Sequence, residues 1–362
     1  MPGPAFTPIG KTDSMTPPIT RVTTWTLDDY NCIIDVRAPV EFADDHLPEA
    51  INLPVLNDAE RAEIGTIHKK VGPFEAKRRG AALVARNIAR HLDTELSNTP
   101  RDFKPLVYCW RGGKRSDAMA RILSEIGWKT AVIEGGYKNY RKHVLETLDS
   151  IPPKLKLVIL RGATGTAKTH ILLAAERKGA QVIDLEGLAH HRGSLLGSEP
   201  GIDQPSQRQF ESGLAAVLER LDPNQPVFIE AESSKIGAIH IPKILWHTMK
   251  DASSVSLSAP VSARVGFLLR DYAHVIAEPE RLEPLLNWVV TRIGHEAVTE
   301  WRALIAAGDW DGFVSRVLED HYDSAYRRSS SRRGHHDLAT LEALELTPDA
   351  IDLMASKLVA SV

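Results

Sequence analysis

From Val22 onward, the chain alternates short apolar runs, typical of strands, with longer stretches whose apolar residues recur at helical spacing. This alternation is typical of α/β folds, in which helices connect the strands of a mostly parallel sheet. At 362 residues, the chain is longer than a single hydrophobic core usually grows. The sequence SIPPK at 150–154 ends a helix with two prolines before a new apolar strand begins. We therefore predict a flexible leader at 1–18 and two α/β domains, at 19–150 and 155–362.

The first domain contains a cysteine followed by glycines and cations, in the sequence YCWRGGKRS at 108–116. The glycines would let this loop curl, so that N–H groups and the next helix N-terminus converge on the sulfur of Cys109. Cations and helix N-termini lower the pKa of a cysteine, so we expect a reactive Cys109 and not a buried, inert thiol. Cys32 has no such loop and is expected in the core. The predicted donor or anion loop comprises Trp110, Arg111, Gly112, Gly113, Lys114 and Arg115.

A second strand, glycine loop and helix follow the domain boundary, in the sequence RGATGTAKT at 161–169. A phosphate-binding P-loop has this context: its N–H groups and helix dipole hold phosphate, Lys168 adds a charge, and Thr169 can reach Mg²⁺. Ala167 replaces the second glycine of the usual pattern, and its methyl group resists a left-handed backbone. We therefore predict phosphate binding and leave ATP hydrolysis open; the alternative is a glycine turn without a ligand. The predicted phosphate-binding residues are Gly162, Thr164, Gly165, Thr166, Ala167, Lys168 and Thr169.

Polar residues at later strand ends and loops add to this second predicted site. Ligands of open α/β sheets bind outside the carboxyl ends of strands, where acids would hold a metal ion or water. The candidate acids are Asp184, Glu230 and Glu232, with a solvated strand end as the alternative for each. His191 and Arg192 are candidate phosphate contacts in a polar, glycine-bearing loop expected near the phosphate site. The candidate contacts to phosphates or stacked bases in the later basic run are Arg327, Arg328, Arg332 and Arg333, with a solvated basic loop as the alternative. The histidine pair at 190–191 has no partners at ligand spacing, so no protein metal site is predicted.

Three longer segments have less specific interpretations. The polar segment 57–80 is either a solvated helical face or a phosphate-contacting patch, and an amphipathic helix is expected at 81–96. The segment 262–320 has a helical pattern, and the residues expected in its core are Trp288, Trp301, Trp310, Leu285, Leu286 and Val289. A long apolar substrate would also need such an aromatic wall.

Overall composition restricts the compartment and the mode of nucleic-acid binding. The formal net charge of −3 means that contacts to nucleic acid must come from local patches. No apolar run reaches the roughly 20 residues needed to cross a bilayer, and the leader lacks the apolar region of a signal peptide. The two cysteines cannot form a disulfide framework. We expect a cytoplasmic protein without membrane attachment, and its oligomeric state stays open.

The motifs together resemble a known family. IDVRAPVEFADDHLPEAINLP, YCWRGGKRS and EGGYKNYR are similar to a rhodanese domain, in which a cysteine-headed loop transfers sulfur-group atoms; Glu49 stands where that family often has glycine. Joined to GATGTAKT, DLEGLAHHRGS, EAESSKIG and HYDSAY, this domain resembles the bacterial tRNA 2-selenouridine synthase family from about Val22 onward. The resemblance implies an α/β fold: an N-terminal rhodanese-like doubly wound parallel sheet, and a C-terminal P-loop NTPase-like α/β domain with helical additions.

The resemblance also implies a reaction. Such enzymes act on tRNA carrying 2-thiouridine at the wobble position, replacing sulfur by selenium, and they attach a geranyl group to that sulfur. The implied substrates are selenophosphate, with a supplier protein as partner, and geranyl diphosphate; no tightly bound cofactor is expected. The loop at Cys109 would suit selenophosphate, and the loop at 162–169 would suit the diphosphate.

Three alternative interpretations remain open on the sequence. In the first alternative, the second domain is an ATP-using kinase or ATPase, and the rhodanese half only senses or carries persulfide. In the second alternative, the protein is a non-enzymatic RNA-binding scaffold that uses both loops only to bind phosphates. For the first domain alone, the C-x5-R spacing from Cys109 to Arg115 also occurs in cysteine phosphatases.

Overall fold

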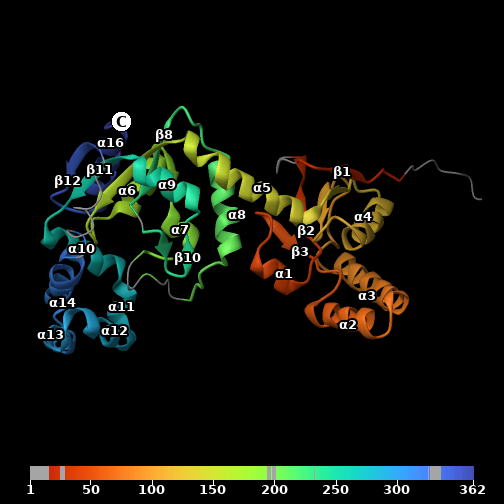
Figure 1. The fold of residues 1–362 in the computed structure, drawn as a ribbon, viewed down its shortest axis with the longest axis horizontal. Coiled ribbons are helices and arrows are strands. Elements are labelled where there is room, and N and C mark those ends of the chain that lie inside the picture. The colour runs from red at the N-terminus through yellow and green to blue at the C-terminus, as the bar shows by residue number, and fades with distance from the viewer. Residues whose placement is uncertain are drawn as a thin grey trace, which may run out of the picture. The chain divides into compact units, whose positions relative to one another are not determined.

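The computed structural model describes residues 16–24, 29–193, 197, 201–231, 233–324, 326 and 336–362. The chain divides into a first unit, Met1–His143, and a second unit, Val144–Val362. The division lies within helix α5 (Gly136–Ser150), ahead of the SIPPK sequence. Each unit contains a parallel five-stranded sheet with helices, which confirms the predicted α/β class (Figure 1). In the described part of the chain, no helix is both long and apolar enough to span a bilayer.

The sheet of the first unit has the strand order β1-β5-β4-β2-β3, with all neighbours parallel. Its strands are β1 (Thr20–Val22), β2 (Cys32–Asp35), β3 (Ala50–Asn52), β4 (Pro105–Tyr108) and β5 (Ala131–Ile133). Its helices before α5 are α1 (Pro39–Asp44), α2 (Asp58–Lys70), α3 (Pro73–Asp93) and α4 (Lys114–Ile126). The central strand β4 is buried along its whole length, as expected for a parallel strand covered on both faces. Ile88 of α3 and Leu123 of α4 pack in one core cluster with Val107 of this strand.

The polar segment 57–80 forms α2 and the beginning of α3. The predicted helix at 81–96 starts earlier than expected, because Pro73 occupies the first turn, where its missing N–H group costs nothing. Within the segment, Arg78 binds Glu75 and Arg79 binds Glu63, each at 2.7 Å on the surface. These pairs favour the solvated helical face over a phosphate-contacting patch.

A buried ion pair at the end of β2 contacts the first turn of α5 through Tyr137. The guanidinium of Arg37, only 1% exposed, donates to Asp35 at 2.6 Å and to the Asp45 carbonyl at 2.6 Å. It also lies 4.1 Å from the ring centroid of Tyr137, whose hydroxyl donates to Asp45 at 2.7 Å. Removing one partner would leave a buried charge uncompensated, at a cost of about 3–5 kcal/mol. This network fixes the turn before α5.

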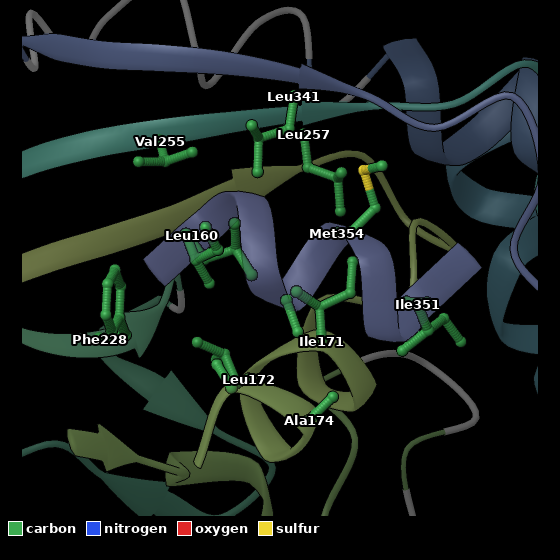
Figure 2. Close-up of a cluster of buried hydrophobic side chains, with 14 of the residues drawn as sticks. Leu160, Ile171, Leu172, Ala174, Phe228, Val255, Leu257, Leu341, Ile351 and Met354 are labelled. Atoms are coloured by element: carbon green, nitrogen blue, oxygen red, sulfur yellow. The ribbon is translucent and has the colours of Figure 1, made fainter. Parts of the chain in front are cut away.

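The second unit has the strand order β12-β11-β6-β8-β7, also with parallel neighbours. Its strands are β6 (Lys156–Gly162), β7 (Gln181–Ile183), β8 (Pro226–Glu230), β11 (Ser253–Ser258) and β12 (Asp337–Glu342), beside a small antiparallel pair, β9 (Lys235–Ile236) and β10 (Ile239–His240). Helices α6 (Lys168–Arg177) and α16 (Pro348–Val359) pack together on one face, where Ile171 and Met354 meet Leu160 and Leu257 (Figure 2). Helices α8 (Gln207–Leu218) and α9 (Lys243–Asp251) contact β7 and β6.

The predicted helical segment is an insertion between two strands of the sheet. It contains α10 (Val261–Asp271), α11 (Ala273–Ala277), α12 (Glu283–Ile293), α13 (His295–Ala306), α14 (Trp310–Val317) and a π-helical turn, η4 (Leu318–Asp323). Its core includes Trp301, as expected, whereas Trp288 is 43% exposed and the expectation of a core position was wrong. Arg292 lies 4.0 Å from the Trp288 ring centroid. The sheet then continues with β12, which the sequence interpretation did not include.

Two residues that replace family glycines adopt a left-handed backbone. Glu49 has φ 63° and Ala167 has φ 60°. For a residue with a Cβ atom, this conformation costs roughly 1–2 kcal/mol. The chain therefore keeps the backbone path of a glycine at both positions and carries local strain there.

Replacing Glu49 by glycine should raise the free energy of unfolding by about 0.5–1 kcal/mol, because relief of the strain outweighs the extra chain entropy of glycine. Glu49 is exposed, so the change removes no packing. Urea unfolding followed by circular dichroism measures it. Glu49→Ala is the matched control, because it removes the carboxylate but keeps the Cβ atom, and it should give no such gain. Equal effects of the two substitutions would contradict the backbone explanation.

Candidate functional site

Cys109 lies at the carboxyl end of β4, directly before the glycine loop and α4. Its sulfur accepts a hydrogen bond from the Gly113 N–H at 3.3 Å and lies 3.3 Å from the Ser116 hydroxyl. The side chain is 4% exposed. Burial raises the pKa of the Cys109 thiol, but hydrogen bonds from Ser116 and from the N–H groups of Gly113, Ser116 and Arg111 outweigh it, so the pKa lies below its ordinary value. This environment stabilises the thiolate, the nucleophilic form.

Two glycines allow the Cys109 loop to pack directly against the turn before α5. A Cβ atom on Gly112, whose φ is 60°, would lie 2.5 Å from the Ile133 carbonyl oxygen. One on Gly136 would lie 2.1 Å from the Cys109 carbonyl oxygen, and the Tyr137 N–H donates to that same oxygen at 2.8 Å. These glycines are therefore required for close approach of two backbones, and the sulfur sits on a rigid loop.

The cations of the Cys109 loop have different roles. Arg115 donates to Glu41 of α1 at 2.9 Å. Its guanidinium therefore binds a protein carboxylate instead of a substrate anion above the Cys109 sulfur. Arg111 and Lys114 are exposed, and neither forms an ion pair within the described part of the chain. Trp110, 36% exposed, packs on Tyr137 with ring centroids 5.3 Å apart. A phosphatase needs the loop arginine on its substrate, so the pairing of Arg115 counts against that alternative.

In the second unit, β6 leads through the 162–169 loop into α6, which begins at Lys168. Ala167 caps this helix with its left-handed backbone, and it is 5% exposed. The Lys168 ammonium donates to the Gly162 carbonyl at 3.1 Å, which leaves two N–H donors for a ligand. The Thr166 hydroxyl donates to the Ala163 carbonyl at 2.8 Å. The loop thus presents a helix N-terminus and an ammonium group to the same space, an arrangement that suits phosphate oxygens.

A hydrogen-bonded chain joins this loop to the ends of the neighbouring strands. The Thr169 hydroxyl donates to Glu186 at 2.6 Å, and the Glu186 N–H donates to Glu230 at 2.8 Å. Glu230, at the end of β8, is fully buried. Asp184 accepts from the Gly187 N–H at the start of helix α7 (Leu185–Ala189), and its burial raises the pKa of its carboxyl group. Two of the predicted acids thus lie near the loop, whereas the predicted Glu232 lies outside the described residues.

Arg264 of α10 is a residue that the sequence interpretation missed. It is 4% exposed, donates to the Thr164 carbonyl at 3.1 Å, and binds both carboxylate oxygens of Asp323 at 2.7 and 2.8 Å. Asp323 lies in the HYDSAY sequence, in η4. The position of Arg264 on the apolar face of α10, beside Val265 and Phe267, was the available signal, because buried arginines need partners.

A cleft of about 1190 Å³ in the second unit brings these groups together. Its lining includes Lys168, Thr169, Asp184, Glu186, His191, Arg192, Tyr272 and Trp288. Arg192 donates to Asp271 at 2.7 Å and lies 5.0 Å from the Tyr272 ring centroid. Burial lowers the pKa of His191, which favours its neutral form. The predicted contacts Arg327, Arg328, Arg332 and Arg333 lie outside the described residues.

Within the described residues, no three His, Cys, Asp or Glu side chains are placed together as a set of metal ligands. The oxygens of Thr169 and Glu186 are nevertheless of the type that Mg²⁺ prefers, and Mg²⁺ at phosphate sites commonly uses only one or two protein carboxylates. The geometry is therefore compatible with a phosphate-bound cation.

Comparisons with known proteins agree for both units. Residues 155–345 match the family model described as the tRNA 2-selenouridine synthase AAA domain, and residues 24–143 match the rhodanese-like domain. The tRNA 2-selenouridine synthase of Nitrosomonas europaea is 36% identical over 270 residues, covering 72% of this chain and 70% of that protein. Its counterpart in Shewanella loihica is 35% identical over 294 residues, covering 80% and 75%, and that of Shewanella frigidimarina is 37% identical over 307 residues, covering 83% and 81%. The chain belongs to the tRNA 2-selenouridine synthase family.

Proposed function

We propose that this protein is a transferase that replaces the sulfur of 2-thiouridine, at the wobble position of tRNA, by selenium. The reaction proceeds in two steps, geranylation of the sulfur and then exchange for selenium. The observation that carries the proposal is the presence of two different anion sites in one chain. One surrounds a stabilised thiolate at Cys109, and the other presents Lys168 and a helix N-terminus.

The first step uses geranyl diphosphate at the 162–169 loop. The thiouridine sulfur forms a bond to C1 of the geranyl group, the C1–O bond breaks, and diphosphate leaves with the electron pair while the base loses its N3 proton. Lys168 and the N–H groups at the start of α6 stabilise the developing negative charge. Thr169 and Glu186 are the residues that would hold Mg²⁺, which would neutralise further charge on the diphosphate.

The second step uses selenophosphate, provided by a supplier protein, at the Cys109 loop. Selenium attacks C2 of the modified base, the geranyl thiol leaves, and water takes up the phosphoryl group. Arg111 and Lys114 are the exposed cations beside Cys109, so they would attract the selenophosphate anion. In this step the Cys109 loop positions the selenium donor beside the base, and no bond to the Cys109 sulfur forms or breaks. A tRNA substrate of this kind would place the protein in the cytoplasm.

Substitutions in the two loops should block different steps. Lys168→Ala should reduce geranylation by about 100-fold or more, because the leaving diphosphate loses its stabilising charge. Cys109→Ala should preserve geranylation and abolish selenium incorporation. Nucleoside mass spectrometry of tRNA from a deletion strain that expresses each variant measures 2-thiouridine, its geranylated form and 2-selenouridine.

Matched controls exist for both substitutions. Lys178→Ala changes a lysine just past the opposite end of α6, and Cys32→Ala changes a thiol that lacks the loop; both should leave all three nucleosides as in the wild type. Normal geranylation by Lys168→Ala would refute the diphosphate site. Normal 2-selenouridine from Cys109→Ala would refute the role of the thiol.

The reactivity of Cys109 should depend on Ser116. Because the Ser116 hydrogen bond lowers the thiol pKa, Ser116→Ala should raise that pKa and move the pH profile of alkylation to higher pH. The rate at pH 7 should fall by about 10- to 100-fold, since a hydrogen bond to a charged group is worth roughly 1.5–3 kcal/mol. Iodoacetamide alkylation in a Cys32→Ala background measures this. Ser124→Ala, at a buried serine of the same helix, should leave the profile unchanged; superimposable profiles for both variants would exclude the Ser116 effect.

A further inference from the structure

A second, apolar cavity adjoins the cleft that contains the 162–169 loop. It has a volume of about 90 Å³ and lies among α10, α11, α12, α13, α14 and η4. Figure 1 shows α11 to α14 grouped together on one side of the second unit's sheet. The cavity and the cleft share five lining residues: Thr164, Leu268, Tyr272, His321 and Tyr322. The apolar cavity therefore opens beside the loop that presents Lys168.

Polarity changes sharply from the mouth of this cavity to its interior. Thr164, Tyr272, His321 and Tyr322 all lie at the shared mouth. The remaining lining is hydrocarbon or aromatic, and its buried members are Leu282, Leu286, Val289, Trp301, Phe313 and Leu318. A nucleotide base needs polar partners for its ring atoms, and the interior offers no side chain of that kind beyond tryptophan N–H groups. A hydrocarbon chain matches this lining.

Side-chain contacts also connect the wall of the cavity to the 162–169 loop. Arg264 binds the Thr164 carbonyl and Asp323 of η4, so one side chain connects the 162–169 loop to the cavity wall. A Cβ atom on Gly165 would lie 2.8 Å from Leu268, which lines the mouth. The position of a phosphate at the loop is therefore fixed relative to the apolar interior.

We propose that this cavity and the mouth that it shares with the cleft hold the isoprenoid chain of the diphosphate donor. The diphosphate lies at Lys168, the first isoprene unit passes Thr164 at the mouth, and the far end of the chain fills the cavity between α12, α13 and α14. The inference rests on the proposed function, and it adds a location and a chain-length limit. Trp301 and Phe313, whose ring centroids lie 6.1 Å apart, form part of the buried wall that limits the length.

Two matched substitutions test the location. Val317 and Val290 both pack, partly buried, on the same hydrophobic cluster, but only Val317 lines the cavity. Calorimetric titration should show that the wild type binds geranyl diphosphate at least tenfold more tightly than inorganic diphosphate. Val317→Phe should lose this advantage while keeping its affinity for inorganic diphosphate, which also reports that the variant is folded. Val290→Phe should behave like the wild type.

Chain length gives a second, independent measurement. Trp310→Ala enlarges the lining from a partly buried position, so it should raise the affinity for farnesyl diphosphate relative to geranyl diphosphate by about tenfold. Filling the cavity with Val317→Phe should weaken binding of dimethylallyl diphosphate least, because that chain is shortest.

The results separate this inference from the proposed function. Equal binding of geranyl diphosphate by Val317→Phe and Val290→Phe, with an unchanged chain-length preference in Trp310→Ala, would place the chain elsewhere and overturn the inference. Geranylated 2-thiouridine in wild-type tRNA would then still support the function. Wild-type protein that binds geranyl diphosphate no more tightly than inorganic diphosphate would overturn the inference as well. Absence of geranylated nucleoside from tRNA of the Cys109→Ala strain, in which the second step is blocked, would overturn the function itself.

Discussion

Both candidate sites depend on backbone N–H groups at the beginning of a helix that follows a central parallel strand. The first N–H groups of a helix have no partner within it, so they are available to an anion. Strand β4 precedes Cys109 and α4, and strand β6 precedes the 162–169 loop and α6; each is the middle strand of its sheet. Neighbours on both sides hold these strands rigidly. The same arrangement of strand, loop and helix N-terminus therefore occurs twice in the chain, once in each unit.

The side chains around the two loops make the two candidate sites chemically different. The Cys109 loop has two exposed cations and a sulfur that accepts hydrogen bonds, so it favours a thiolate and an incoming anion. The 162–169 loop has an ammonium group, but the Glu186 carboxylate lines the same cleft and accepts from Thr169, and the buried Glu230 accepts from the Glu186 N–H. Carboxylates there would repel a bare phosphate unless a cation or a hydrogen-bonded hydroxyl lies between them. This contrast is the basis on which we propose two different reactions at the two sites.

Much of the fold was predictable because buried parallel strands appear as short apolar runs that end in polar residues. Strands β2, β4, β6 and β8 all have this pattern, and glycine loops follow two of them. Strands β11 and β12 were missed for a physical reason. The sequence SSVSLS of β11 contains four serines, and β12, DLATLE, is a largely exposed edge strand, so neither forms an apolar run. Nothing in the sequence indicated that Trp288 would lie on the surface.

The sequence by itself determined the two strand, glycine loop and helix segments. With them it determined the position of Cys109 at the end of its strand and of Lys168 and Thr169 in the first turn of α6. Local geometry over a few residues is sufficient for this. Only the tertiary structure decided that Arg115 binds Glu41, 74 positions away, and that Arg264 binds Thr164, 100 positions away. It also created the apolar cavity, which is lined by residues from several helices. Such contacts depend on how distant elements pack against one another, and no short stretch of the sequence specifies that packing.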